Sequence, residues 1–256
     1  MFGVTQLSGG GSGGPGAQTL YRPDAAIFDG TNDYLQLSAN LTGAVNGQDY
    51  TWRVALKFNG GDGASQKIFG ALINGPYSHD MTRLASNKIF FYSHDNPAVN
   101  FAFHTTSTTS ITATTGWKHF MLSIDGSAGT IHYYLDDASD KGTTVIDDVN
   151  TGSVFSSLGI GAASGGASKC NVSMCDFIYA QEYLDISVEA TRRKFVNADG
   201  TIADWETALG AFATTPRMAL HLDDGEAAAN FADNADGAGQ AFTVNGTLTS
   251  ENGPNG

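Results

Sequence analysis

Hydrophobic and polar residues alternate along much of the chain from Ala26 onward. In YTWRVALKF, residues 50–58, one face holds Trp52, Val54, Leu56 and Phe58, and the other holds Thr51, Arg53, Ala55 and Lys57. A period of two is typical of a β-strand, because successive side chains point to opposite faces of a sheet. The segment is therefore predicted to be a strand with one buried face.

The same alternation recurs in Trp117–Asp125 and Thr130–Asp136, and the residues DGSAG between them predict a hairpin turn. Further strands are predicted at Lys67–Ile73, Lys88–Tyr92, Val99–His104, Leu158–Ala162, Val172–Tyr183, Met218–Leu222 and Ala241–Leu248. Many strands with regular turns and few helices indicate an antiparallel sandwich or barrel.

One segment has the pattern of a helix, Ile186–Phe195. Asp185 or Ser187 can cap its amino end, and the basic residues 192–194 suit its carboxyl end. No break in composition divides the strand series, so we expect a single sandwich with one short lateral helix.

Six segments follow one another in a recognisable order: FDGTNDYLQL from Phe28, YTWRVALKF, GWKHFMLSID, GTIHYYLDD, LGIGAASGG and CDFIYAQEYLD. Together they resemble the concanavalin A-like, laminin-G-like jelly rolls over Ala26–Leu184. The resemblance implies an all-β, antiparallel jelly-roll β-sandwich. One departure is Asp136-Asp137 where that family usually has Asp-Gly, so the turn type is expected to differ.

A second resemblance lies closer to the carboxyl end. EATRRKFVNADG, residues 189–200, and NFADNADGAGQAFTVNGTLT, residues 230–249, resemble the closing segment of laminin-G-like proteins of tailed bacteriophages. Gly239-Gln240 stands where a glycine pair is common in that segment. The resemblance implies a bacteriophage virion protein, a head decoration or tail subunit, whose carboxyl-terminal segment returns to the sandwich.

The amino-terminal segment, residues 1–22, is rich in glycine and serine between Ser8 and Gly16. Such a composition cannot bury enough apolar surface to order itself. We expect an assembly arm that contacts other virion proteins or further copies of the chain through Phe2, Val4 and Leu7, and a sandwich domain at residues 23–256. The start MFGVTQLSGGGSGGPG lacks the pattern of a secretory signal, which fits a virion protein made in the bacterial cytoplasm.

Charge narrows the range of partners. The chain has 13 basic and 26 acidic residues and a net charge of -13. That excess of acid argues against binding to nucleic acid or to an anionic membrane surface. No run of about 18 apolar residues predicts a membrane span.

A glycosidase is the enzyme class to test on this fold. Retaining glucanases of the class place their carboxylates alternately on one strand, so that they share a cleft. The nearest set here is Glu182, Asp185 and Glu189, whose spacings of three and four break that parity. We therefore predict that the chain is not an enzyme.

The tetrapeptide YSHD occurs twice, at residues 77–80 and 92–95. Adjacent residues on an extended chain face opposite ways, so one copy cannot form a Ser-His-Asp relay. Two neighbouring copies can gather a metal or sugar site from Tyr77, His79, Asp80, Tyr92, His94 and Asp95. The alternative is that each copy is a strand end followed by a turn.

Calcium is the one cofactor that the acidic loops suggest. Asp29 and Asp33 flank the turn that opens FDGTNDYLQL, and Asp223, Asp224 and Glu226 form an acidic cluster. No self-contained calcium loop is present in the sequence, and a solvated acidic surface explains most of these residues. We interpret FDGTNDYLQL mainly as the opening of a strand, with Leu35 and Leu37 on its buried face.

Trp52 is predicted to lie in the core, Trp117 at a rim, and Trp205 has no clear face. Cys170 and Cys175 are five apart, which places them on opposite faces of one strand as reduced, buried thiols. Two hypotheses of function remain. The first is the non-enzymatic virion subunit; the alternative is a glycan-binding, lectin-like adsorption module that recognises a host-surface polysaccharide.

Overall fold

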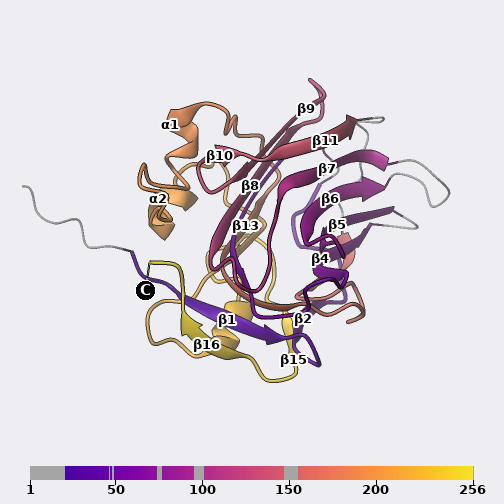
Figure 1. Cartoon of the computed structure of the whole chain (residues 1–256), viewed down its shortest axis with the longest axis vertical. Coiled ribbons are helices and arrows are strands. Elements are labelled where there is room, and N and C mark those ends of the chain that lie inside the picture. Colours follow the sequence, from indigo (N-terminus) through magenta and orange to yellow (C-terminus); the bar gives the residue numbers. More distant parts are fainter. Residues whose placement is uncertain are drawn as a thin grey trace, which may run out of the picture.

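Two antiparallel β-sheets packed face to face make up most of the structure (Figure 1). The structure is a computed structural model, and it describes residues 21–45, 47, 49–73, 77–94, 101–146 and 155–255. Within these ranges only the backbone is described for Ile73, Tyr77, His94, Phe101 and Ala102. The all-β prediction of an antiparallel sandwich is confirmed.

Sheet A runs β10 (Ala138–Ser139), β9 (Thr130–Leu135), β8 (Lys118–Asp125), β3 (Tyr50–Phe58), β13 (Asn171–Ala180), β1 (Asp24–Asp29) and β16 (Thr249–Asn252), with β14 (Met218–Leu220) also paired to β13. Sheet B runs β11 (Lys141–Ile146), β7 (Phe101–Ser110), β6 (Lys88–His94), β5 (Tyr77–Arg83), β4 (Gln66–Ile73), β12 (Phe155–Ile160), β2 (Tyr34–Leu37) and β15 (Thr243–Asn245).

The main core lies between the sheets and is organised around Trp52 of β3, which is 5% exposed. Its ring meets Phe69 and Phe91 of sheet B at centroid distances of 4.6 and 5.3 Å, both edge to face. Edge-to-face packing is favourable because the positive ring edge meets the negative ring face. Trp52 is a core residue, as predicted, and the inward positions of FDGTNDYLQL, Leu35 and Leu37, also belong to this core.

A further layer covers the outer face of sheet A, and the sequence pattern did not predict it. Two short helices belong to this layer: α2 (Trp205–Leu209) packs on β8 and β13, and α1 (Glu189–Arg192) lies near β10 (Figure 1). Because of this layer, β3 is buried on both faces, and Arg53 is only 1% exposed. The expectation of one exposed face for residues 50–58 is therefore wrong.

The predicted lateral helix is shorter than Ile186–Phe195 and lacks a side-chain cap, because its N-cap residue is Val188. Asp185 instead accepts hydrogen bonds from the backbone and hydroxyl of Ser187, which turns the chain before the helix. Two further short helices occur in the described residues, α2 and the 3-10 helix η1 (Ala228–Ala232). Asp204 caps α2 by accepting from the backbone N of Thr207 at 2.8 Å, so the Asp-x-x-Thr spacing was a usable signal.

The carboxyl-terminal segment returns to both sheets. β15 pairs with β2 and β16 pairs with β1. Strand β5 was not predicted as a strand, nor were β11 and β16. No helix in the described part of the chain is long and apolar enough to cross a membrane.

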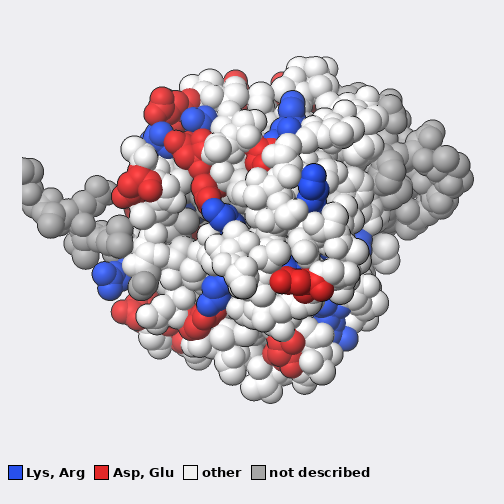
Figure 2. All heavy atoms as spheres, in the orientation of Figure 1, with Lys and Arg blue, Asp and Glu red and all other residues white. Residues whose placement is uncertain are grey.

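Charged side chains of both signs are scattered over the face shown in Figure 2, with a mixed cluster over α1. In that cluster the Asp137 carboxylate accepts from Arg192 and Arg193, each at 2.7 Å. Glu189 adds a contact of 3.0 Å to Arg193. The acidic excess of the sequence therefore does not form a single acidic surface on this face.

Candidate functional site

The structure brings the two YSHD copies together by pairing β5 with β6. In this antiparallel register Ser78 lies opposite His94, His79 opposite Ser93, and Asp80 opposite Tyr92. The second copy lies at the end of β6, as the alternative expected, whereas the first copy begins β5. Asp95 lies outside the described residues, as do the side chains of Tyr77 and His94.

The pleat of the sheet sends neighbouring side chains within each copy to opposite faces. His79 points into the sandwich and is 1% exposed, with its Nε2 3.2 Å from the Ser93 hydroxyl. Its ring packs edge to face on Tyr50, Phe103 and Phe155 at 5.5 to 5.8 Å. His79 is therefore enclosed by the core and does not reach a ligand on the outer face of sheet B.

Asp80 and Tyr92 point to the outer face, where they meet Lys67 of β4. The Lys67 ammonium lies 3.0 Å from Asp80 Oδ2 and donates to the Tyr92 hydroxyl at 2.7 Å. The same ammonium lies 4.8 Å from the centroid of the Tyr92 ring. Burial, together with the charge of Asp80, raises the pKa of Tyr92, so the phenol keeps its proton.

Two more rings extend this group along sheet B. Phe90 lies two residues before Tyr92 on the same face of β6, and their ring centroids are 5.0 Å apart. His104 of β7 stands opposite Tyr92 in register, with its ring 5.7 Å from that of Phe90. We call this set the aromatic face: Lys67, Asp80, Phe90, Tyr92 and His104.

Each of the three rings of the aromatic face is partly exposed. Lys67, Phe90 and His104 were not singled out from the sequence. A signal was available for Phe90, because positions two apart on a strand share a face. Lys67 and His104 come from the strands on either side, and only the register of the sheet shows that they join Asp80 and Tyr92.

The loop between β12 and β13 borders the aromatic face and explains the glycines of LGIGAASGG. Gly159 of β12 lies opposite Gly70 of β4. A Cβ atom on Gly159 would stand 2.6 Å from the carbonyl oxygen of Ala163. A Cβ atom on Gly70 would stand 2.9 Å from the Cα of Ala163 and 3.0 Å from Asp80 Oδ1. The two glycines thus let the loop lie on the sheet next to Asp80.

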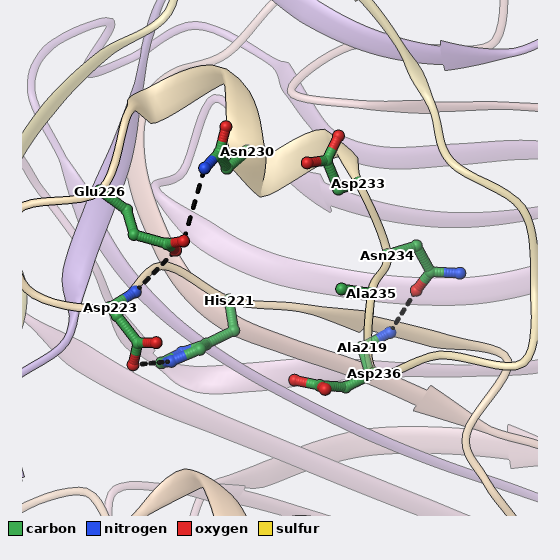
Figure 3. Close-up of a pocket in the computed structure, with 9 residues that line it drawn as sticks. All are labelled: Ala219, His221, Asp223, Glu226, Asn230, Asp233, Asn234, Ala235 and Asp236. Atoms are coloured by element: carbon green, nitrogen blue, oxygen red, sulfur yellow. Dashed lines mark hydrogen bonds and ion pairs between the residues drawn. The ribbon is translucent and has the colours of Figure 1, made fainter.

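A second feature is an acidic cavity of about 200 Å³ beside β14 and η1 (Figure 3). His221 stacks on Trp205 at 4.7 Å and lies 3.0 Å from Asp223. Glu226 accepts from the backbone N of Asp223, and Asn234 accepts from the backbone N of Ala219 (Figure 3). Most of the polar groups that line this cavity are thus bonded to the protein itself.

His221 also connects the cavity with the buried Asp176, whose Oδ1 lies 3.0 Å from His221 Nδ1. Burial acts to lower the pKa of His221, but hydrogen bonds and charges from Asp176 and Asp223 outweigh it, so the pKa is raised. Trp205, which had no predicted face, is 4% exposed, and its Nε1 donates to Asp236 at 2.6 Å.

No group of three or more His, Cys, Asp or Glu side chains within the described ranges is placed to hold a metal ion. Asp29 accepts from the backbone N of Thr31 and Asn32 at 2.7 and 3.0 Å. Asp33 is 5% exposed and accepts from the backbone N of Thr247 at 2.8 Å. Both carboxylates therefore organise turns, and calcium binding by them stays a prediction.

The three carboxylates considered for glycosidase chemistry have separate partners. Glu182 accepts from the backbone N of Ala213, Asp185 from Ser187, and Glu189 contacts Arg193. Cys170 and Cys175 are free, buried and packed in different hydrophobic clusters, as their predicted opposite faces require.

Comparison with known proteins shows the fold. No protein-family model matches the sequence, and no curated protein matches it. The structure is similar to that of a heptameric SAP-like pentraxin from Limulus polyphemus, with a TM-score of 0.53 and 13% identity over 90% of this chain and 94% of that chain. It is also similar to a putative carbohydrate binding protein from Bacteroides ovatus, with a TM-score of 0.61 and 13% identity over 92% of this chain and 62% of that chain.

The chain thus has a jelly-roll fold of the lectin-like, concanavalin A type. This result confirms the fold that the sequence resemblance implied. At 13% identity the likeness carries no information on individual binding residues. The function has to be inferred from the chemistry of the sites.

Proposed function

We propose that this protein is a glycan-binding, lectin-like module without enzymatic activity, and that the aromatic face is its binding surface. The observation that carries the proposal is the contiguous set of partly exposed rings with an ion pair beside it. Phe90 and Tyr92 are 5.0 Å apart, and Lys67 and Asp80 are 3.0 Å apart at the edge of the Tyr92 ring.

Sugar chemistry matches this arrangement. A pyranose ring has a face of C–H groups, which packs on an aromatic ring, and a rim of hydroxyls, which bond charged or polar side chains. Phe90 and Tyr92 supply the rings, whereas Asp80 accepts from hydroxyls and Lys67 donates to them. Binding sites commonly combine such apolar surface with a few fixed polar groups.

Rigidity also supports the proposal. Lys67, Asp80 and Tyr92 come from three adjacent strands, and the Lys67 ammonium contacts both of the other side chains. Little side-chain entropy is left to lose when a ligand binds, which favours affinity. The shared fold with a putative carbohydrate binding protein points to the same class of function.

The virion setting enters as a prediction from sequence resemblance alone. The residues of the assembly arm, Phe2, Val4 and Leu7, lie outside the described residues. If the chain belongs to a phage particle, a glycan-binding module would serve adsorption to a host-surface polysaccharide.

The test is binding of the full chain to an array of bacterial and animal glycans, followed by affinity electrophoresis in the best polysaccharide. Tyr92→Ala and Phe90→Ala should each weaken binding about two- to tenfold, because an aromatic contact contributes about 0.5 to 1.5 kcal/mol. Tyr92→Phe should lose less, since it keeps the ring and removes only the hydroxyl.

Tyr183→Ala is the matched control, because Tyr183 is also a partly exposed tyrosine, stacked on His132 away from the aromatic face. It should bind like the wild type. A polysaccharide that binds with equal affinity to the wild type, Tyr92→Ala and Phe90→Ala would refute the aromatic face as the site. An array without any specific binding would refute the function.

A further inference from the structure

A cavity of about 270 Å³ lies on the opposite side of the sandwich, against the outer face of sheet A. Its floor comes from β3 and β8, and its walls come from the turn at residues 199–202 and from the carboxyl-terminal residues 254 and 255. None of the residues of the aromatic face lines it. The residues that line the cavity include Ala55, Trp117, His119, Asp136, Asp199 and Asn255.

His119 gives the cavity a hydrogen-bond donor. It is 2% exposed, and its Nε2 lies 3.0 Å from Arg53 Nε, which always carries a proton. Nε2 must therefore accept, so the ring proton resides on Nδ1. Burial, with the charge of Arg53, lowers the pKa of His119, so the ring stays neutral.

The Nδ1–H of His119 has no hydrogen-bond partner in the described residues, and neither does Nη1 of the buried Arg53. Buried donors without partners are rare because each costs free energy. A partner that enters from outside the chain would remove the cost at His119, which borders the cavity.

The walls add acceptors and an apolar surface. Asp136 is held in a left-handed conformation, with φ of 55°, and its carboxylate contacts Lys118 and the backbone N of His119. Asp199 shapes the adjoining turn by accepting from Thr201. Trp117 is partly exposed, and the Lys57 ammonium lies 5.5 Å from its ring centroid.

We propose that this cavity is a second binding site, which takes a single neutral sugar ring or a cyclic polyol of that size. Trp117 would contact the C–H face of the ring, His119 would donate to one hydroxyl, and Asp136 would accept from another. The carboxylates of Asp136 and Asp199 disfavour an anion, whereas the ammonium of Lys118 disfavours a cation. The volume is below the roughly 300 Å³ at which pockets for larger ligands begin.

This site is independent of the aromatic face, because the two lie on the outer faces of different sheets. The test uses the full chain with methyl α-glucoside, methyl α-galactoside, methyl α-mannoside and N-acetylglucosamine as separate probes. Binding is measured by saturation-transfer NMR and by iodide quenching of tryptophan fluorescence. Trp52 and Trp205 are 5% and 4% exposed, so quenching reports mainly on Trp117.

At least one probe should give a saturable NMR signal and protect Trp117 from iodide. Trp117→Ala should weaken that binding about tenfold. Ala55→Val is the second variant, because it adds volume at the cavity floor and leaves every polar group in place. It should abolish binding while the melting temperature stays at or above that of the wild type.

Tyr183→Ala, at a partly exposed tyrosine that belongs to neither site, should leave monosaccharide binding unchanged. If none of the probes binds, the cavity holds only water and the proposal is overturned. Binding that survives both Trp117→Ala and Ala55→Val also overturns it. Monosaccharide binding lost only in Tyr92→Ala would place the sugar on the aromatic face, which rejects this site and supports the proposed function.

Discussion

Arg53 Nη2 lies 3.1 Å from Asp176 Oδ2, and both side chains are completely buried between sheet A and the layer that covers it. Asp176 also accepts from the Tyr21 hydroxyl and contacts His221, and Arg53 donates to the carbonyl of Ala203. This pair therefore ties β3 and β13 to the first described residue and to the segments that contain Ala203 and His221. It lies where β13 bulges, with Asp176 at a φ of 53°.

Removing the charge of one partner should lower the free energy of unfolding far more than removing both charges. Asp176→Asn keeps a residue that tolerates positive φ but leaves the Arg53 charge buried and uncompensated. We expect a loss of about 3 to 5 kcal/mol in the free energy of unfolding. The double variant Arg53→Met with Asp176→Asn should lie closer to the wild type than Asp176→Asn does.

Urea unfolding measures these free energies. The control is Glu189→Gln, which breaks an ion pair in which Glu189 is 69% exposed, and it should cost no more than about 0.5 kcal/mol. If the loss in the double variant equals the sum of the losses in Asp176→Asn and in Arg53→Met alone, Arg53 and Asp176 do not form a coupled pair.

His221 should make stability depend on pH. Burial opposes its charge, but Asp176 and Asp223 raise its pKa above the ordinary value of 6.5. A group whose pKa is raised by folding stabilises the protein below its unfolded pKa and loses that effect as pH rises through the folded pKa. The stabilisation due to His221 should thus be complete at about pH 5.5, below the ordinary pKa, and should be lost as the pH rises through the raised pKa of the folded state.

Comparison with His221→Gln isolates this effect, because every other titrating group is common to both proteins. The difference in unfolding free energy between the wild type and the variant should be larger at the acidic end. A difference that stays constant across this range, or grows with pH, would contradict the raised pKa.

Arg53 shows how far the sequence could predict the fold. Alternation in residues 50–58 correctly assigns Trp52 to the core face and Arg53 to the other. It states which residues share a face but not what covers that face. The cover comes from residues more than a hundred positions later, such as Ile202 against Ala55, so the burial of Arg53 could not be predicted locally.

The binding surface was predictable in part. The repeated YSHD pointed to the right strands, and parity places Asp80 on the opposite face from His79 and Tyr92 on the opposite face from Ser93. The register of β4, β5, β6 and β7 is what joins them to Lys67 and His104. Register is fixed by the whole core, so a single strand cannot reveal it.

The glycine pair beneath the loop after β12 should be intolerant of side chains. Gly159→Ala would place a Cβ 2.6 Å from the carbonyl oxygen of Ala163, so the loop must move away from the sheet. We expect a loss of about 1 to 3 kcal/mol, typical of overpacking. Gly47→Ala is the control, because a Cβ there meets nothing within 4 Å, and it should not destabilise. Equal melting temperatures for the two variants would show that the loop does not rest on Gly159.

Substitutions at Asp29 can show whether its carboxylate binds calcium, as predicted for Asp29 and Asp33, or only stabilises the turn. Three backbone N–H groups, of Thr31, Asn32 and Asp33, donate to Asp29 Oδ1. Burial acts to raise the pKa of Asp29, but these hydrogen bonds outweigh it and lower the pKa. If the Asp29 carboxylate only stabilises the turn, its hydrogen-bond acceptor atom contributes more to stability than its negative charge does.

Asp29→Asn should then retain most of the stability of the turn, whereas Asp29→Ala should cost about 1 to 3 kcal/mol. On this structural reading, calcium and EDTA leave the melting temperature of the wild type unchanged. A ligand that binds only the folded state raises the melting temperature by mass action. A calcium-dependent rise in the wild type that Asp29→Asn abolishes would therefore establish a metal site at this turn, with the hydrogen bonds to Thr31 and Asn32 holding its ligand in place.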